Sequence, residues 1–191
     1  IALTVEAGHV ITAMMNNLND QVIIADFGPS VTNANPTVNS YTVTGAGGGR
    51  GVSIAHACNM TSVFVSSANT NSIIRVDFGN TLQNAPTAVN SLNYVFSSPA
   101  GVSVINDDGK WLAVVPSNIS GNVTVVSLDT GLTNNNPTLL TTYTLPGSVN
   151  LVGLTTLKEN SDWYIAIADE GTTKFFSINP VNACSANPPV S

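Results

Sequence analysis

Residues 75–87 read Arg-Val-Asp-Phe-Gly-Asn-Thr-Leu-Gln-Asn-Ala-Pro-Thr, and close copies of this stretch recur along the chain. Its proline has counterparts at a spacing of 50 or 51 residues: Pro36, Pro86, Pro137 and Pro188. Its aspartate also has counterparts, at Asp26, Asp77, Asp129 and Asn179. Self-similarity at one fixed period is the sequence signature of a repeat architecture.

A third landmark keeps the same period, at Gly51-Val52-Ser53, Gly101-Val102-Ser103 and Gly153-Leu154-Thr155. The three landmarks divide the chain into four repeats, 1–50, 51–100, 101–152 and 153–191. In the second repeat we expect strands at 51–57, 61–67, 72–78 and 91–97, with a long loop before the last one. The turns between them are rich in Asn, Asp and Gly, which tolerate a positive φ.

The second and third strands of each repeat are nearly continuous apolar runs, such as Trp111 to Val115 and Tyr164 to Ala168. A strand with one face in water would alternate, so these runs indicate sheets that are covered on both faces. Four short strands per repeat predict an all-β fold of four tandem propeller blades. An immunoglobulin-like sandwich needs about seven strands per hundred residues and has no internal copy.

The last repeat stops after its long loop, without an outer strand, and four blades are few for a closed ring. We therefore expect the chain to be part of a larger propeller of roughly six to eight blades.

The composition indicates an extracellular protein. Charged residues make up only 8% of the 191 residues, hydrophobic residues 43%, and the net charge is −6. Five scattered cations argue against nucleic acid as a partner, and no apolar run is long enough for membrane insertion. Cys58 and Cys184 fall in the second and fourth repeats, and the sequence leaves open whether they are free or paired.

Residues 75–89 resemble the blade repeat of very large surface proteins of gliding bacteria, in which an Asp-Phe-Gly-Asn-Ser-Leu-x-Asn-x-Pro-Thr pattern recurs. The similarity extends to Asp108-Gly109-Lys110-Trp111. The third repeat departs from the pattern at Thr130, and the fourth lacks the Phe and Gly after Asn179. The resemblance implies an exported propeller segment associated with adhesion or motility, and it transfers no catalytic residue.

Several recurring residues have both a functional and a structural interpretation. Asp26, Asp77 and Asp129 end their strands. We favour Asx turns for these three over a ring of cation-binding carboxylates. Glu6, Asp107 and Glu159 meet the first turn of their repeats, and we favour solvated turn residues over an acidic rim at a channel mouth. The repeated Trp111 and Trp163 are expected to pack between blades rather than stack on sugar rings.

No catalytic motif or metal site emerges from the sequence. His9 and His56 share no metal-ligand spacing, and the glycine cluster at 45–51 lacks the Lys-Ser/Thr ending of a phosphate loop. We interpret that cluster as a flexible crossing between the first two blades.

These observations favour a secreted or cell-surface binding or adhesion module without a cofactor, whose partner is a protein or a surface glycan. The alternatives are a structural spacer in a giant surface protein and, less favoured, an enzyme whose active site lies in further blades.

Overall fold

The computed structural model describes residues 1–148, 150–159, 162–170 and 175–178, which form strands, turns and loops. The strands are β1 (Ala2–Glu6), β2 (His9–Asn16), β3 (Gln21–Asp26), β4 (Thr37–Thr42), β5 (Gly49–Ala57), β6 (Met60–Ser67), β7 (Ser72–Asp77), β8 (Ala88–Ser91), β9 (Ser103–Asp107), β10 (Lys110–Pro116), β11 (Asn122–Asp129), β12 (Thr138–Thr144), β13 (Leu151–Glu159), β14 (Asp162–Asp169) and β15 (Phe175–Ile178). No helix in this described part is long and apolar enough to span a bilayer.

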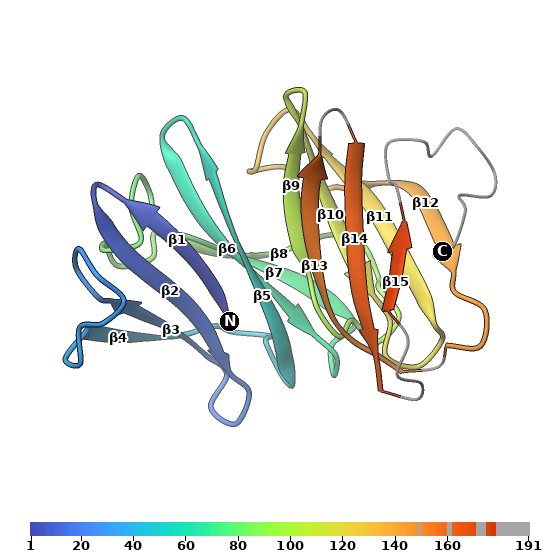
Figure 1. Cartoon of the computed structure of the whole chain (residues 1–191), viewed down its shortest axis with the longest axis horizontal. Helices are drawn as coiled ribbons and strands as arrows, with labels where there is room; N and C mark the ends of the chain where they lie inside the picture. The colour runs from blue at the N-terminus through green and yellow to red at the C-terminus, as the bar shows by residue number, and fades with distance from the viewer. Residues whose placement is uncertain (149, 160–161, 171–174, 179–191) are drawn as a thin grey trace.

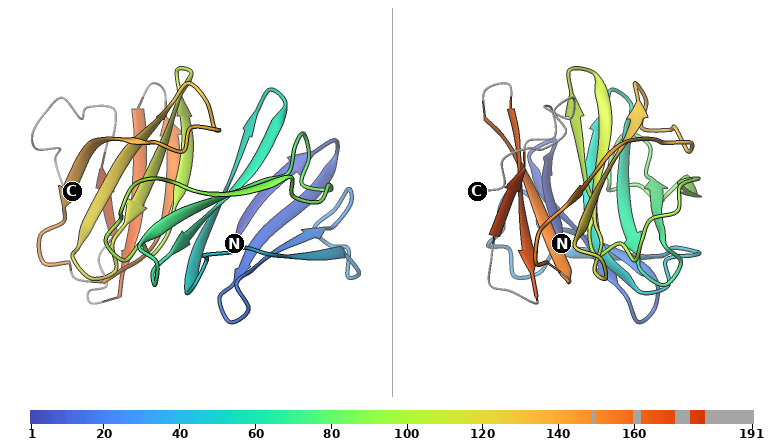
Figure 2. Two further views of the ribbon diagram at one scale, coloured as in Figure 1. Left: turned by 180° about the vertical axis from the view of Figure 1, so that it is seen from behind. Right: turned by 90° about the vertical axis from the view of Figure 1, so that its right-hand side faces the viewer.

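The strands form four antiparallel sheets, each paired in chain order. We call them blade 1 (β1–β4), blade 2 (β5–β8), blade 3 (β9–β12) and blade 4 (β13–β15). Figure 1 shows the blades side by side along the long axis, with the first strands β1, β5, β9 and β13 neighbouring one another. We call these four the inner strands. Seen from behind in Figure 2, β4, β8 and β12 lie on the opposite side.

Tight turns join the inner strand of a blade to its second strand. In blade 1 the turn is Ala7-Gly8, with φ of 48° and 81°, and in blade 3 it is Asp108-Gly109, with 48° and 86°. Two successive positive φ values give the turn a twist that matches the flanking strands. The short hairpins keep each sheet a simple meander.

The hydrophobic core consists of three clusters, one between each pair of neighbouring blades. The strand β10 shows why its sequence is continuously apolar. Ala113 and Val115 belong to the cluster shared with blade 2, whereas Leu112 and Val114 belong to the cluster shared with blade 4. Successive side chains point to opposite faces of a sheet, so a sheet covered on both faces needs apolar residues at every position.

Two sequence expectations about the blades are wrong. The fourth strand of blade 2 is Ala88–Ser91, not 91–97, because pairing with β7 begins shortly after the loop at Pro86. The side chains of Leu92 and Phe96 instead enter the core between blades 2 and 3. The glycine cluster at 45–51 is likewise not only a crossing, because its last three residues already belong to β5.

The glycines at the start of the inner strands mark a close approach of the blades. A Cβ placed on Gly51 would lie 2.7 Å from the Cα of Gly101, and one on Gly101 would lie 3.0 Å from Leu154 Cδ2. At Gly51 the backbone of blade 2 lies against the backbone of blade 3, and a larger side chain has no room. At Gly51 and Gly101, though not at Gly153, the glycine landmark of the sequence therefore marks a close approach of neighbouring blades.

Candidate functional site

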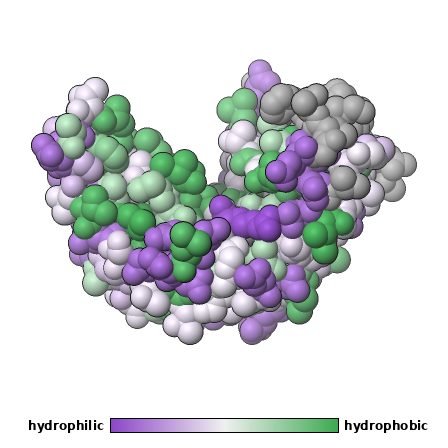
Figure 3. Space-filling view, turned by 90° about the horizontal axis from the view of Figure 1, so that it is seen from below, coloured by the Kyte–Doolittle hydropathy of each residue, from purple (hydrophilic) through white to green (hydrophobic). Residues whose placement is uncertain are grey.

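The inner strands enclose a hollow on the concave side of the arc. It has a volume of about 380 Å³ and is lined by residues of β1, β5, β9 and β13. We call it the channel hollow. Figure 3 shows that the arc of blades is open on one side. The volume falls in the range of ordinary ligand pockets, roughly 300–1,000 Å³.

The side chains that line the channel hollow are uncharged and include both hydroxyl-bearing and aliphatic ones. Ser103 Oγ and Thr156 Oγ1 lie 2.8 Å apart, joining blades 3 and 4. Val104 N donates to Ser53 Oγ at 3.0 Å, joining blades 3 and 2. Leu3 is 59% exposed and contributes apolar surface. The wall therefore offers hydrogen bonds and apolar contacts, and none of the described side chains that line it is charged.

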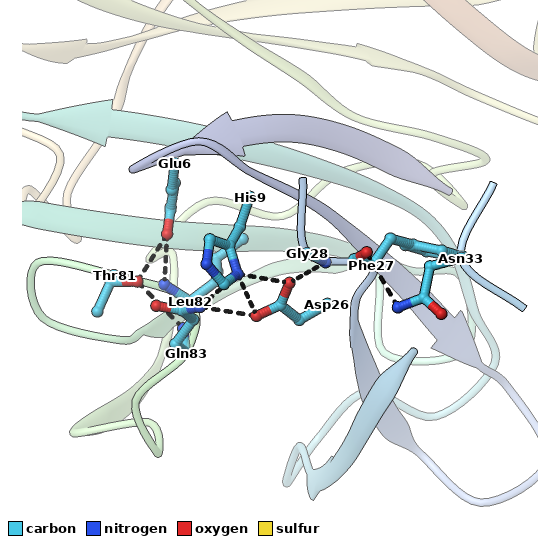
Figure 4. A network of polar contacts seen from close by, with 9 residues as sticks. All are labelled: Glu6, His9, Asp26, Phe27, Gly28, Asn33, Thr81, Leu82 and Gln83. Carbon is cyan, nitrogen blue, oxygen red and sulfur yellow. Dashed lines mark hydrogen bonds and ion pairs between the residues drawn. The ribbon is translucent and has the colours of Figure 1, made fainter. Parts of the chain in front are cut away.

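Glu6, at the end of β1, binds blade 2 and is not a solvated turn residue as expected. Its Oε2 accepts hydrogen bonds from Thr81 Oγ1 at 2.7 Å and from Leu82 N at 3.0 Å (Figure 4). Its Oε1 accepts one from Thr61 Oγ1 at 3.4 Å. The carboxylate thus holds the long loop and second strand of the next blade, and its side chain is only 12% exposed.

Asp107 plays the same part between blades 3 and 4, so the expectation of a solvated residue is wrong here too. It occupies the matching end of β9, and its Oδ1 accepts a hydrogen bond from Trp163 Nε1 at 3.0 Å. Lys158 Nζ lies 3.5 Å from the same oxygen and 5.4 Å from the centroid of the Trp163 ring. Because these partners lie on the next blade, the position could not be recognised from its own repeat.

His9, Asp26 and Gln83 form a second polar contact between blades 1 and 2 (Figure 4). His9 Nδ1 lies 3.0 Å from both carboxylate oxygens of Asp26, and Gln83 Nε2 donates to Asp26 Oδ2 at 2.7 Å. A carboxylate can only accept, so Nδ1 carries the proton in this arrangement. Asp26 Oδ1 also accepts from Gly28 N at 2.7 Å, which is an Asx turn.

These contacts favour the ionised form of Asp26. Burial by itself raises the pKa of the carboxyl group, but the hydrogen bonds from Gln83, Gly28 and His9, with the charge of His9, lower the pKa below its ordinary value of 3.8. A carboxyl group with a lowered pKa stabilises the fold above its unfolded-state pKa. That contribution is lost as the pH falls through the folded-state value.

We therefore expect Asp26→Asn to lower the free energy of unfolding by about 0.5–1.5 kcal/mol at pH 7, because the amide keeps the Asx turn but loses the charge. The difference from the unmodified chain should shrink as the pH falls below 3.8. Urea unfolding at a series of pH values measures both effects. Asp129→Asn, at the same repeat position, is the matched control, because Asp129 is exposed. If the difference in the free energy of unfolding did not depend on pH, the ionised form of Asp26 would not be what stabilises the fold.

The other recurring aspartates do not repeat the Asx turn of Asp26. Asp77 is buried and receives hydrogen bonds from Arg75 Nε at 2.9 Å and from Ser62 Oγ at 2.7 Å. Arg75 Nη1 donates to Leu132 O at 2.7 Å, in the long loop of blade 3. Asp129 is exposed and has a φ of 62°. One sequence position thus serves three local structures, because each blade presents different partners.

The other residues that recur in the repeats lie in the core between blades or next to a strand. Trp111 packs against the core between blades 2 and 3, and Trp163 lies on the face of blade 4 that meets blade 3. Pro36, Pro86 and Pro137 precede β4, β8 and β12. Asn179, Pro188 and Cys184 lie outside the described residues. Cys58 is an exposed free thiol. The described residues contain no cluster of three His, Cys, Asp or Glu side chains that could hold a metal ion.

Sequence reasoning missed the residues that join the blades, above all Arg75, His9, His56, Thr81 and Gln83. For Arg75 a signal was available. It stands two residues before Asp77 on a strand, which places both side chains on one face, and the chain has only five strong cations. For the others the partner on the neighbouring blade is 52 to 75 residues away, and no local pattern marks it.

We compared the sequence and the structure of this chain with those of known proteins. No family model and no curated protein matches the sequence. Among solved structures, the chain superposes on a chain of a nidogen/laminin complex with a TM-score of 0.58 at 15% identity, covering 96% of this chain and 65% of that one. A β-xylosidase gives a TM-score of 0.62 at 8% identity, with coverages of 99% and 71%. The fold is a β-propeller. The expectation of tandem propeller blades is confirmed.

An exo-β-1,3-galactanase from Phanerochaete chrysosporium is also similar, with a TM-score of 0.54 at 11% identity. The alignment covers 97% of this chain and 49% of the galactanase chain. The chain therefore spans between about half and seven tenths of the length of these neighbours. At such low identities the likeness establishes the propeller fold alone, and it includes both a protein from a complex and glycosidases.

Proposed function

We propose that this chain is a non-catalytic binding module of an extracellular protein, and that its channel hollow receives a segment of a partner protein. The observation that carries the proposal is the mixture of hydroxyl-bearing and aliphatic side chains, none of them charged, along the wall of the hollow. Hydroxyl groups such as those of Ser53 and Thr155 can hydrogen-bond to a peptide backbone, while Leu3 and Leu154 offer apolar contact. A peptide segment needs both kinds of contact along its length.

The carboxylates at the blade junctions support a binding scaffold. Glu6, Asp77 and Asp107 each accept hydrogen bonds from at least two groups, and the contacts of Glu6 and Asp107 cross to the next blade. Groups that are engaged in this way hold the inner strands in fixed positions. A rigid wall lowers the entropic cost of ordering a binding surface when the partner arrives.

An extracellular setting is supported by the low charge and the abundance of Asn, Ser and Thr, and by the resemblance to surface proteins of gliding bacteria. The structural likeness to a chain of the nidogen/laminin complex supports protein binding by this architecture. We therefore place the module on a secreted or cell-surface protein, with an adhesive role.

A hydrolase is the second candidate, and one local arrangement favours it. Thr4 Oγ1 lies 2.8 Å from His56 Nε2, and His56 Nδ1 lies 3.4 Å from Glu6 Oε1. Hydroxyl, imidazole and carboxylate follow one another here in the order used for acyl transfer. We assign these residues to the junction between blades 1 and 2 instead, because His56 Nδ1 also lies 3.0 Å from Thr61 Oγ1, and Thr61 in turn binds Glu6.

The test uses a phage-displayed peptide library that is selected on the 191-residue chain. Selected peptides are then measured on Thr155→Trp, whose indole would fill the channel hollow, and on Thr138→Trp, an exposed position of β12 outside it. We expect binding to weaken at least about tenfold with Thr155→Trp, since this corresponds to about 1.4 kcal/mol. Binding to Thr138→Trp should be unchanged.

Three outcomes would overturn the proposal. Peptide binding that survives Thr155→Trp would place the site elsewhere. If the library yielded no binding peptide and the chain bound sugars on a glycan array, the ligand would be a carbohydrate. Hydrolysis of 4-nitrophenyl acetate or of aryl glycosides that is lost in His56→Ala would make the chain an enzyme.

A further inference from the structure

A second, smaller hollow adjoins the channel hollow, and its wall holds a charged side chain. It has a volume of about 180 Å³ and is lined by residues near the starts of the inner strands. Ile1, Val52, Val102 and Leu154 line both hollows, so the two lie next to each other. Arg50 is the only charged side chain among the described residues that line either of them. We call the smaller one the Arg50 hollow.

Arg50 stands at one end of the channel, because β5, β9 and β13 run in the same direction. Residues from neighbouring inner strands lie against each other in the same order along the chain: Gly51 with Gly101, then Ser53 with Val104; Ser103 with Thr156, then Asp107 with Lys158. The strand starts therefore gather at one end of the channel, with Arg50 as the second residue of β5. Asp107 and Glu159 end β9 and β13 at the other. A segment in the channel therefore meets the guanidinium group at one end only.

A β-bulge holds Arg50 at the wall of the hollow. The register between β5 and β6 shifts between Gly49 and Val52, so that Arg50 and Gly51 both lie opposite Ser66. Gly51 N donates to Ser66 Oγ at 2.9 Å, which fixes the bulge. A bulge changes the direction in which a side chain points, and bulges are frequent next to binding and active sites.

The cation belongs to blade 2 and not to the repeat. The residues equivalent to Arg50 in blades 3 and 4 are Ala100 and Val152, which line the same hollow. The fold therefore does not require a charge at this position. Blade 2 packs on blade 1 through one core cluster and on blade 3 through another, so further blades would leave Arg50 facing the channel.

The guanidinium group of Arg50 is available to a ligand. Arg50 is exposed and has no ion pair or hydrogen bond within the part of the chain that the structure describes, whereas Arg75 and Lys158 contact carboxylates. A guanidinium group presents its N–H donors as a planar fork that matches the two oxygens of a carboxylate. The net charge of −6 disfavours anions at long range, so an acidic ligand needs a direct contact of this kind.

We propose that the segment received by the channel hollow carries a carboxylate, which Arg50 binds in the Arg50 hollow. The inference rests on the proposed peptide binding and adds a direction to it, because the acidic end of the segment lies at the strand starts. The carboxylate belongs to an Asp or Glu side chain or to the C-terminus of the partner, since both present the same two oxygen atoms.

The experiment adds a second library to the peptide selection. Peptides fused to the phage coat protein through their C-terminus offer only side-chain carboxylates, whereas peptides fused through their N-terminus also offer a free C-terminal carboxylate. The library that yields Arg50-dependent binders identifies the source. Selected peptides are then synthesised with the carboxylate and with an amide in its place, and their dissociation constants are measured by fluorescence anisotropy.

For a carboxylate peptide we expect Arg50→Gln to weaken binding at least about tenfold, as for the loss of a hydrogen bond between charged groups. The amide form should bind the wild-type chain and Arg50→Gln equally. Arg50→Lys should restore part of the affinity, because it keeps the charge but not the planar fork. Lys110→Gln is the matched control, since it removes one charge at an exposed position at the start of β10, outside both hollows. It should leave the affinity unchanged.

The outcomes separate this inference from the proposed function. Peptides that are weakened by Thr155→Trp but bind Arg50→Gln as tightly as the wild type would overturn the carboxylate contact and leave peptide binding in place. Equal losses for the carboxylate and amide forms, or an equal loss in Lys110→Gln, would also overturn the contact. If neither library yielded a peptide, the proposed function and this inference would both be wrong.

Discussion

Replacing Arg75 by methionine is expected to lower the free energy of unfolding by about 3–5 kcal/mol, the cost of leaving one partner of a buried ion pair without the other. The side chains of Arg75 and Asp77 are 3% and 9% exposed, and their atoms approach to 2.9 Å. Without the guanidinium group, the Asp77 carboxylate stays buried with Ser62 Oγ as its remaining side-chain donor among the described contacts. The carbonyl of Leu132 also loses its donor, which loosens the junction between blades 2 and 3.

Urea unfolding followed by tryptophan fluorescence measures this loss, since Trp111 and Trp163 lie in blades 3 and 4. The double variant Arg75→Met, Asp77→Leu provides the control, because replacing a whole buried pair by apolar groups is often neutral. It should recover most of the stability that Arg75→Met loses. If the double variant were as unstable as the single one, the loss would come from packing or from Leu132, and not from the unpaired charge.

The second large effect is expected at Gly51, where the backbones of blades 2 and 3 lie against each other. In Gly51→Ala the new methyl group would lie 2.7 Å from Gly101 Cα. The methyl carbon is fixed to the backbone of blade 2 and Gly101 Cα is part of the backbone of blade 3, so neither can move away without parting the two blades. We expect a loss of about 1–3 kcal/mol, as for other overpacked sites. The measurement is again urea unfolding.

Gly153→Ala is the matched control for Gly51→Ala. Gly153 is the equivalent glycine of blade 4, but a Cβ there meets no atom within 4 Å. Its substitution should change the free energy of unfolding by less than about 0.5 kcal/mol. Equal losses at both positions would show that the effect of Gly51→Ala comes from strand conformation and not from the contact with Gly101.

Much of the architecture followed from the sequence because it depends on local patterns that repeat. The recurring Pro36, Pro86 and Pro137 gave the period, and the unbroken apolar run at Trp111–Val115 showed that both faces of a sheet are covered. The wrong prediction of a strand at 91–97 also came from a local pattern. Those residues are apolar enough for a strand, but a side chain such as Phe96 is drawn into the core between blades, and only tertiary packing provides that core.

The polar junctions could not be derived in this way. Glu6 has the same local sequence setting as any acidic turn residue, and what makes it a joining residue is the loop at Thr81, about 75 residues further on. Asp26, Asp77 and Asp129 occupy one repeat position, but Asp26 and Asp77 have different partners and Asp129 is exposed. The surroundings of each depend on the side chains that come near it in space.

By itself, therefore, the sequence determined the repeat, the strand-rich blades and the burial of both sheet faces. These follow from backbone geometry and side-chain periodicity within about fifty residues. Only the tertiary structure decided which carboxylates join the blades, what lines the channel hollow and where Arg50 lies. Hydrogen bonds and close packing between blades act over a few ångströms in space, and sequence separation carries almost no information about them.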